Sequence, residues 1–152
     1  MSHICLYFSG DEKNEPALFC GDTLFNAGVG RCDFGGDPEI MFETFSDQIF
    51  SLEDNVRIYP GHDWPFKNGN LRALDLIRHH NQRLEILLSN AQKKPLSVSD
   101  GIDLLFNKRF ESHELFFAAG ESRAHLNHLS KQNKVKKDTI NRNGQEIDIF
   151  YV

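Results

Sequence analysis

Two side chains that are able to bind a metal follow the ends of two short apolar segments. Asp22 comes just after residues 17–20, and His62 comes after residues 56–59 and a Pro-Gly pair. If the two segments are neighbouring strands that run the same way, both side chains emerge at one edge of a sheet. A carboxylate and an imidazole suit zinc, iron or manganese, and the two carboxylate oxygens can bridge a pair of metals. From spacing alone, a turn aspartate and a loop histidine are the common alternatives.

The segments that must position these side chains can be read from the apolar pattern. Residues 3–8 form a strand with two apolar faces, which we expect to be buried on both sides. Glycine-rich passages at 26–31 and 35–38 let the backbone approach a ligand closely. The remaining predicted elements are a helix that starts at Asp37-Pro38 with Met41, Phe45 and Ile49 on one stripe, helices near 70–91, 99–107 and 121–132, and a hairpin over 134–152 that turns at Asn143-Gly144.

Three motifs stand in order along the chain: G-D-T-L-F at 21–25, G-V-G-R-C-D-F at 28–34 and Y-P-G-H at 59–62. Together they resemble the metallo-β-lactamase-fold hydrolases, and in particular the glyoxalase II (hydroxyacylglutathione hydrolase) branch. In that family the Asp of G-D-T bridges two metal ions and the His of P-G-H binds the second. The resemblance therefore implies that Asp22 is a catalytic metal ligand and that His62 is a metal ligand.

The same resemblance implies a role for Arg31, which matches a family position next to the substrate loop. Its guanidinium could bind a carboxylate of a glutathione-like substrate. A structural hydrogen bond to Asp33 or to loop carbonyls is the alternative for this side chain. Cys32 has no evident partner base, so we do not expect a nucleophile there.

The implied fold is α/β. We expect residues 1–95 to form the C-terminal half of an αββα metallo-β-lactamase-like sandwich, with a mostly antiparallel or mixed sheet and flanking helices. Residues 96–152 are expected to form a small module of a helix and a two-stranded wing.

The family takes its other metal ligands from an H-x-H-x-D-H motif and from a further histidine, and this sequence contains no H-x-H pair. His3 falls on a non-ligand position of the family pattern. The chain thus looks like the C-terminal half of a hydrolase that starts at an internal Met. A complete site would hold two zinc ions, with iron or manganese as alternatives, and we expect weak or absent binding in this chain alone. The seven histidines are residues 3, 62, 79, 80, 113, 125 and 128.

Structural roles are expected for the other histidines. His79 and His80 are adjacent on a helix and point about 100° apart, so they are poorly placed to share a metal. His125 and His128 are three residues apart and could share one geometrically. No carboxylate or cysteine cluster accompanies them in the sequence pattern.

Two functions are consistent with these observations. The first is a metal-dependent thioester hydrolase of the glyoxalase II type, incomplete and inactive until the missing N-terminal half is supplied. The second is a non-catalytic protein-interaction module derived from such a hydrolase. One half of a two-sheet sandwich exposes an apolar face, so we expect the missing half, or a second copy of the chain, to cover it. A small thioester is the expected substrate of the completed site.

Composition excludes several other classes of protein. The formal net charge is −5, and the one basic cluster, Lys131, Lys134, Lys136 and Lys137, fits a solvated helix end followed by an edge strand. Nucleic acid is therefore not an expected partner.

Three cysteines without a C-x-x-C pair argue against a disulfide scaffold. No apolar run reaches the roughly 20 residues of a membrane span and no signal peptide is evident, so a cytoplasmic location is expected.

Overall fold

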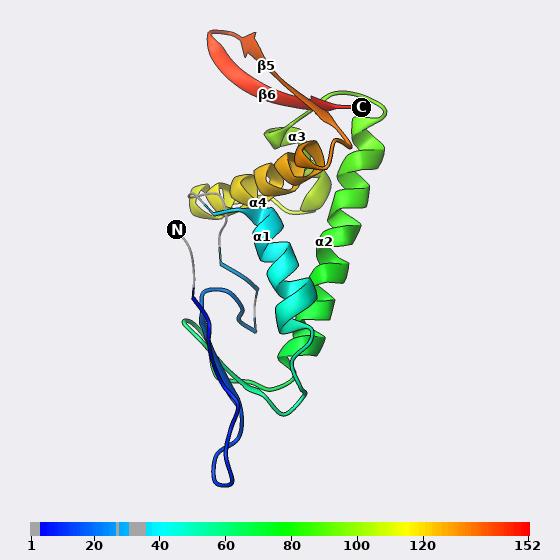
Figure 1. Ribbon diagram of the computed structural model, residues 1–152. Helices are drawn as coiled ribbons and strands as arrows, with labels where there is room; N and C mark the ends of the chain where they lie inside the picture. Colours follow the sequence, from blue (N-terminus) through cyan, green and yellow to red (C-terminus); the bar gives the residue numbers. More distant parts are fainter. Residues whose placement is uncertain (1–3, 27, 31–35) are drawn as a thin grey trace. The chain divides into compact units, whose positions relative to one another are not determined.

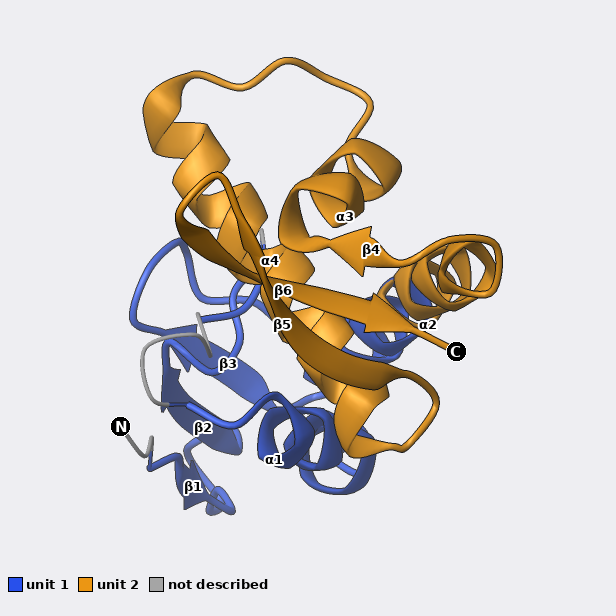
Figure 2. Cartoon of the chain, turned by 90° about the horizontal axis from the view of Figure 1, so that it is seen from above, with its two compact units in different colours: residues 1–79 blue, residues 80–152 orange. Residues whose placement is uncertain are grey.

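A computed structural model describes residues 4–26, 28–30 and 36–152 of the chain (Figure 1). The chain divides into two compact units, Met1–His79 and His80–Val152, which Figure 2 shows in different colours. The division falls within α2 (Gly69–Ala91), the long helix predicted near 70–91. The domain boundary expected after residue 95 stays a prediction. Each unit is described by itself below.

The first unit contains a mixed three-stranded sheet in the order β1-β2-β3. Its strands are β1 (Leu6–Phe8), β2 (Ala17–Gly21) and β3 (Arg57–Pro60). β1 pairs antiparallel with β2, and β2 pairs parallel with β3. Parallel pairing of β2 and β3 is the condition under which the residues that follow the two strands emerge at one sheet edge.

The helix predicted to start at Asp37-Pro38 is present, and it changes from an α-helix to a π-helix at Thr44. The Asp37 carboxylate caps α1 (Pro38–Glu43) by accepting a hydrogen bond from the Glu39 amide, as the Asp-Pro start predicted. A π-helical segment, η1 (Thr44–Ile49), continues directly from it and buries Phe45 and Ile49. The core of this unit lies on one face of the sheet and contains Leu18, Cys20, Leu24, Phe45, Ile49, Val56, Ile58, Ala73 and Leu76.

The expectation that the first strand is buried on both sides is wrong. β1 is an edge strand, and all three of its residues are exposed. Cys5, just before it, packs against the core. The opposite sheet face carries Leu6, Phe8, Phe19 and Tyr59, which are 66%, 43%, 49% and 36% exposed. We call these four residues the open sheet face.

The second unit contains two helices and an antiparallel sheet in the order β4-β6-β5. Its elements are β4 (Leu96–Ser97), α3 (Val98–Leu105), α4 (Ser112–Lys131), β5 (Lys136–Arg142) and β6 (Gln145–Tyr151). α4 starts nine residues before the predicted position of 121, because Glu111 and Glu114 form a capping box there. The unit's core contains Leu87, Ala91, Leu96, Leu126, Leu129, Val135 and Phe150.

The predicted hairpin is confirmed, including its turn. Asn143 and Gly144 have φ angles of 55° and 81°, as a type I′ turn requires. β5 is an edge strand with every residue exposed, and Lys137 forms an ion pair with Asp148 of β6. The lysine cluster is therefore a helix end followed by an exposed edge strand, as expected.

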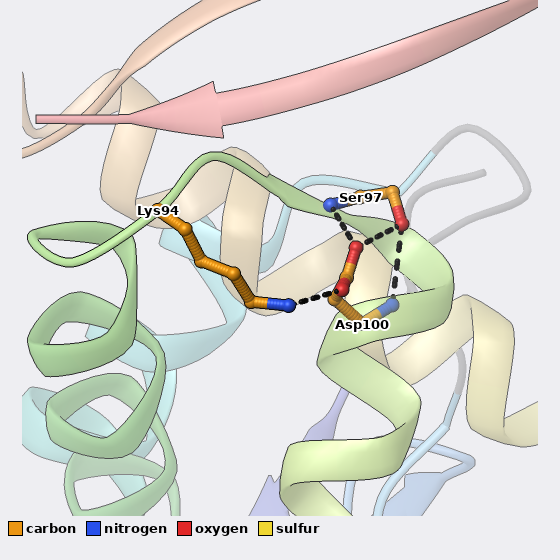
Figure 3. Close-up of polar contacts among 3 residues, drawn as sticks. All are labelled: Lys94, Ser97 and Asp100. Carbon is orange, nitrogen blue, oxygen red and sulfur yellow. Dashed lines mark hydrogen bonds and ion pairs between the residues drawn. The ribbon is translucent and has the colours of Figure 1, made fainter. Parts of the chain in front are cut away.

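A short polar network fixes the start of α3 (Figure 3). The Asp100 amide donates to Ser97 Oγ, and the Asp100 carboxylate accepts from the Ser97 amide, which closes a capping box. Lys94 Nζ lies 2.8 Å from the other carboxylate oxygen. Burial raises the pKa of the Asp100 carboxyl, but the hydrogen bonds from Lys94 and Ser97 outweigh this effect and lower the pKa to about 2.

Candidate metal centre

The sheet brings Asp22 and His62 together, as the chain pattern predicted. Gly21 is aligned with Pro60 at the ends of β2 and β3, after a shift in register that follows Phe19. The Gly61 amide donates to the Gly21 carbonyl at 2.8 Å and extends the pairing by one residue. The next side chain on each segment is a potential metal ligand. His62 Nε2 lies 3.3 Å from Asp22 Oδ1.

Two glycines leave room for this contact. A Cβ atom on Gly61 would lie 2.7 Å from Asp22 Oδ1, and one on Gly30 would lie 2.5 Å from the Asp22 carbonyl oxygen. Both distances are too short for a side chain. The Gly30 amide donates to that same carbonyl at 2.6 Å. The glycine-rich loop therefore holds the backbone of Asp22 from one side while Gly61 leaves space for its carboxylate.

The Asp22–His62 pair is open to solvent. The two side chains are 43% and 72% exposed. The ring of Phe25 lies edge-on to His62, with 5.9 Å between the centroids. The ligand atoms of both side chains are therefore accessible to solvent.

Cys20, immediately before this edge, is a core residue. Its thiol is buried and lies 3.3 Å from the Leu24 carbonyl oxygen. Burial raises the pKa of the Cys20 thiol to about 11. The thiol therefore stays protonated at neutral pH, as expected of a cysteine packed in a core. Cys5 and Cys20 are both free thiols.

The chemistry of Asp22 and His62 fits a zinc ion, since one carboxylate oxygen and one imidazole nitrogen can reach a common point. No third His, Cys, Asp or Glu among residues 4–26, 28–30 and 36–152 completes a set of three with them. The pair is therefore a partial ligand set. Arg31, the predicted substrate-binding residue, lies outside the described residues, as do Cys32 and Asp33.

A second group of potential ligands, which the sequence analysis missed, lies within the second unit. Single ligand atoms of His80, Glu121 and His125 all lie within 4.8 Å of one another. The available sequence signal was the spacing of Glu121 and His125, four residues apart on α4 and so on one helix face. The partner that the sequence spacing suggests for His125 is His128, whose Nε2 instead lies 2.7 Å from Gln132 Nε2.

None of the helices in the described part of the chain has the length and apolarity to cross a bilayer.

Comparisons with known proteins point to the family that the motifs suggested. Residues 84–145 match the family model described as "Metallo-beta-lactamase-like, C-terminal domain". The chain is 44% identical over 95 residues to a hydroxyacylglutathione hydrolase of Nitrosococcus oceani, covering 62% of this chain and 35% of that protein. It is 36% identical over 104 residues to a probable hydroxyacylglutathione hydrolase of Schizosaccharomyces pombe, covering 68% and 40%. A cytoplasmic hydroxyacylglutathione hydrolase of Arabidopsis thaliana is 39% identical over 66 residues, covering 43% and 25%.

Solved structures show the same fold. A beta-lactamase domain protein from Burkholderia ambifaria superposes with a TM-score of 0.72 at 22% identity, over 96% of this chain and 46% of that chain. A metallo-beta-lactamase family protein from Thermus thermophilus gives a TM-score of 0.65 at 21% identity, over 91% and 44%. The aligned parts therefore span about a third of the curated relatives and under half of the solved chains. The chain has the α/β metallo-β-lactamase fold and is similar in sequence to the hydroxyacylglutathione hydrolases, which confirms the resemblance seen in its motifs.

Proposed function

We propose that this chain contributes part of the metal site of a metal-dependent thioester hydrolase of the hydroxyacylglutathione hydrolase type. The observation that carries the proposal is the 3.3 Å separation of Asp22 Oδ1 and His62 Nε2 at the ends of two parallel strands. This separation suits two ligands of one ion, and Asp22 has a second oxygen for another. The named activity of the curated relatives supports the thioester class.

The site residues divide into metal ligands, glycines that leave space for them, and one substrate-binding arginine. Asp22 and His62 bind zinc, with iron or manganese as the metals that the same donors also accept. When bound, the metal supplies Lewis-acid chemistry towards the thioester carbonyl. Gly30 binds the Asp22 carbonyl through its amide, and Gly61 leaves space for the Asp22 carboxylate. Arg31 binds a carboxylate of the substrate through its guanidinium.

The proposal includes a covering polypeptide. The open sheet face consists of apolar side chains from all three strands of the first unit, and Phe19 and Tyr59 stack on it with 4.8 Å between ring centroids. An apolar sheet face of this kind is normally packed against a second layer. The curated relatives extend well beyond the part that matches this chain. We propose that a polypeptide equivalent to their remaining part covers this face and brings the other metal ligands, in the cytoplasm that the name of the Arabidopsis relative indicates.

Complementation tests this function directly. The full chain is mixed with a polypeptide that carries the H-x-H-x-D-H portion of the Nitrosococcus oceani relative, and zinc-dependent cleavage of a glutathione thioester is followed by thiol release. We expect activity from the mixture and from neither part alone. Asp22→Asn and His62→Ala should each abolish it, whereas Asp47→Asn, an exposed aspartate on η1, should not. A fully active Asp22→Asn mixture would contradict the proposal.

A non-catalytic interaction module is the second candidate, and the open sheet face is the observation that favours it. Under this function the same polypeptide, or a second copy of the chain, would bind this face without any metal-dependent turnover. Binding that persists in both the Asp22→Asn and His62→Ala variants, together with no thioester cleavage by the mixture of the unchanged chain and the complementing polypeptide, would identify this alternative.

A further inference from the structure

We propose that the second unit contains a zinc-binding site formed by His80, Glu121 and His125. None of these residues belongs to the three motifs that carry the family resemblance. His80 lies in α2, and the other two are one turn apart on α4. Two imidazoles and one carboxylate are a common protein ligand set for zinc, with a fourth position left for water.

The nitrogen atoms are already close to their zinc-bound separation. His80 Nδ1 lies 3.0 Å from His125 Nε2. Two ligands held about 2.0–2.1 Å from zinc in tetrahedral geometry lie about 3.3 Å apart. The two nitrogens therefore need to separate by only a few tenths of an ångström, while the His80 ring turns so that both lone pairs point at the ion. All three ligand atoms fall within 4.8 Å of one another, so the Glu121 carboxylate lies beside the two nitrogens.

The orientation of His125 is fixed for metal binding. Its Nδ1 lies 2.8 Å from the Glu121 carbonyl oxygen, so Nδ1 carries the proton and donates it. The lone pair is then on Nε2, the nitrogen that faces His80. A carbonyl that holds the far N–H of a histidine is the usual support for a zinc ligand, because it fixes the tautomer and the ring plane. The His125 ring is also buried.

Without metal, His80 donates Nδ1–H to His125 Nε2. Zinc binding requires the His80 Nδ1 lone pair, so this proton leaves Nδ1 and a proton from water is taken up at Nε2. No net proton is gained or lost, the His80–His125 hydrogen bond is replaced by the two bonds to zinc, and the Arg83–Glu121 ion pair gives way where the carboxylate binds the ion. The tautomer of His80 therefore reports directly on occupancy of the site.

Arg83 makes the site weaker than its ligand set alone suggests. Its guanidinium forms an ion pair with Glu121 Oε1 and also lies 4.6 Å from the centre of the Phe106 ring. The cation competes with zinc for the carboxylate and repels the ion. Removal of this charge by Arg83→Gln should therefore tighten zinc binding by about tenfold.

The test uses the full chain with Asp22→Ala and His62→Ala, so that the proposed thioesterase site cannot contribute. Zinc is titrated by equilibrium dialysis, and long-range proton–nitrogen spectra follow the imidazole rings. We expect one zinc per chain, a change of His80 from the Nδ1–H to the Nε2–H tautomer, and no tautomer change at His128. The unchanged chain should therefore bind more zinc than the weak or absent binding that Asp22 and His62 alone would give.

Single-site variants complete the design. His125→Ala should weaken zinc binding at least about 100-fold, since loss of a supporting residue alone costs 10 to 100-fold. His128→Ala is the matched control, because His128 is an equally buried histidine on the same helix and should leave binding unchanged. If His125→Ala does not fold, His80→Ala, at a half-buried position, serves instead. Unchanged zinc binding in His80→Ala, or zinc uptake without a His80 tautomer change, would overturn the proposal.

Discussion

The two groups of potential ligands are held in different ways. Asp22 and His62 follow strand ends, are largely exposed, and depend on close backbone contacts at Gly30 and Gly61. The group around His125 lies on helices, is half-buried or buried, and is held by side chains and a helix carbonyl within its own unit. A site at a sheet edge can thus receive ligands from another polypeptide, whereas a site between helices is completed by its own unit.

The cores of the two units also differ in how completely they are covered. The first unit packs its sheet on one face and leaves the open sheet face uncovered, while the second unit surrounds Phe150 completely. We therefore expect the second unit to depend on its own packing and the first to depend partly on a covering layer. The following predictions test that difference.

Phe150→Ala should have the largest effect on stability. Phe150 has no exposed surface and lies in the core of the second unit, so its truncation leaves a cavity that costs about 3–5 kcal/mol. Urea unfolding followed by circular dichroism measures this loss. Ile140→Ala, on the neighbouring strand β5 and 40% exposed, is the control and should cost under about 1 kcal/mol. Equal losses in the two variants would show that this core is not closed.

Gly61→Ala should act on the site of the first unit with little effect on folding. The added methyl group would lie 2.7 Å from Asp22 Oδ1 and force the carboxylate away from His62. A displacement of about 1 Å costs about 100-fold in rate, so thioester cleavage by the complemented chain should fall by that factor. Gly28→Ala, in the glycine-rich loop that follows β2, is the control, because a Cβ there meets no atom within 4 Å. Full activity of the Gly61→Ala variant would show that Gly61 is not needed to leave space for the Asp22 carboxylate.

The features that could be predicted from the sequence have local signals, and they occur in both units. The Asp37-Pro38 start predicts a capped helix through fixed φ and a side-chain acceptor, and Asn143-Gly144 predicts a type I′ turn through positive φ angles. The placement of Asp22 beside His62 required one further assumption, that β2 and β3 pair in parallel, and the structure has that pairing.

The features that could not be predicted depend on contacts between distant segments. Residues 3–8 are apolar on both faces, and the sequence does not show that β1 lies at a sheet edge with one face uncovered. His80 and His125 are 45 residues apart, so their contact depends on how two helices meet. The register of Glu121 and His125 indicates a shared helix face, but it does not identify the third ligand.

Acid should destabilise the second unit through Asp100. The pKa of this carboxyl is lowered to about 2 in the folded chain from an ordinary value of 3.8, so the folded state favours its ionised form. The resulting stability is present above about pH 4 and is lost as the pH falls towards 2. Because the side chain is 34% exposed, we expect about 1 kcal/mol. Asp100→Asn should remove about that much at pH 7 and flatten unfolding free energy between pH 4 and 2. A mutant that keeps the wild-type pH profile would assign the acid sensitivity to other groups.

Phe19→Ser should have the smallest effect on the chain itself and a clear effect on its association. Phe19 is 49% exposed on the open sheet face, so its replacement should change the free energy of unfolding by only about 0.5–1 kcal/mol. In the complex it would be covered, and loss of an aromatic anchor at the centre of an interface weakens binding by about 2 kcal/mol or more. Sedimentation of the chain with the complementing polypeptide measures this difference. Lys13→Ser, in the polar turn between β1 and β2, is the control and should leave association unchanged. If Phe19→Ser binds as tightly as the unchanged chain, the covering layer does not sit on this face, and the contrast between an open first unit and a closed second unit fails at that point.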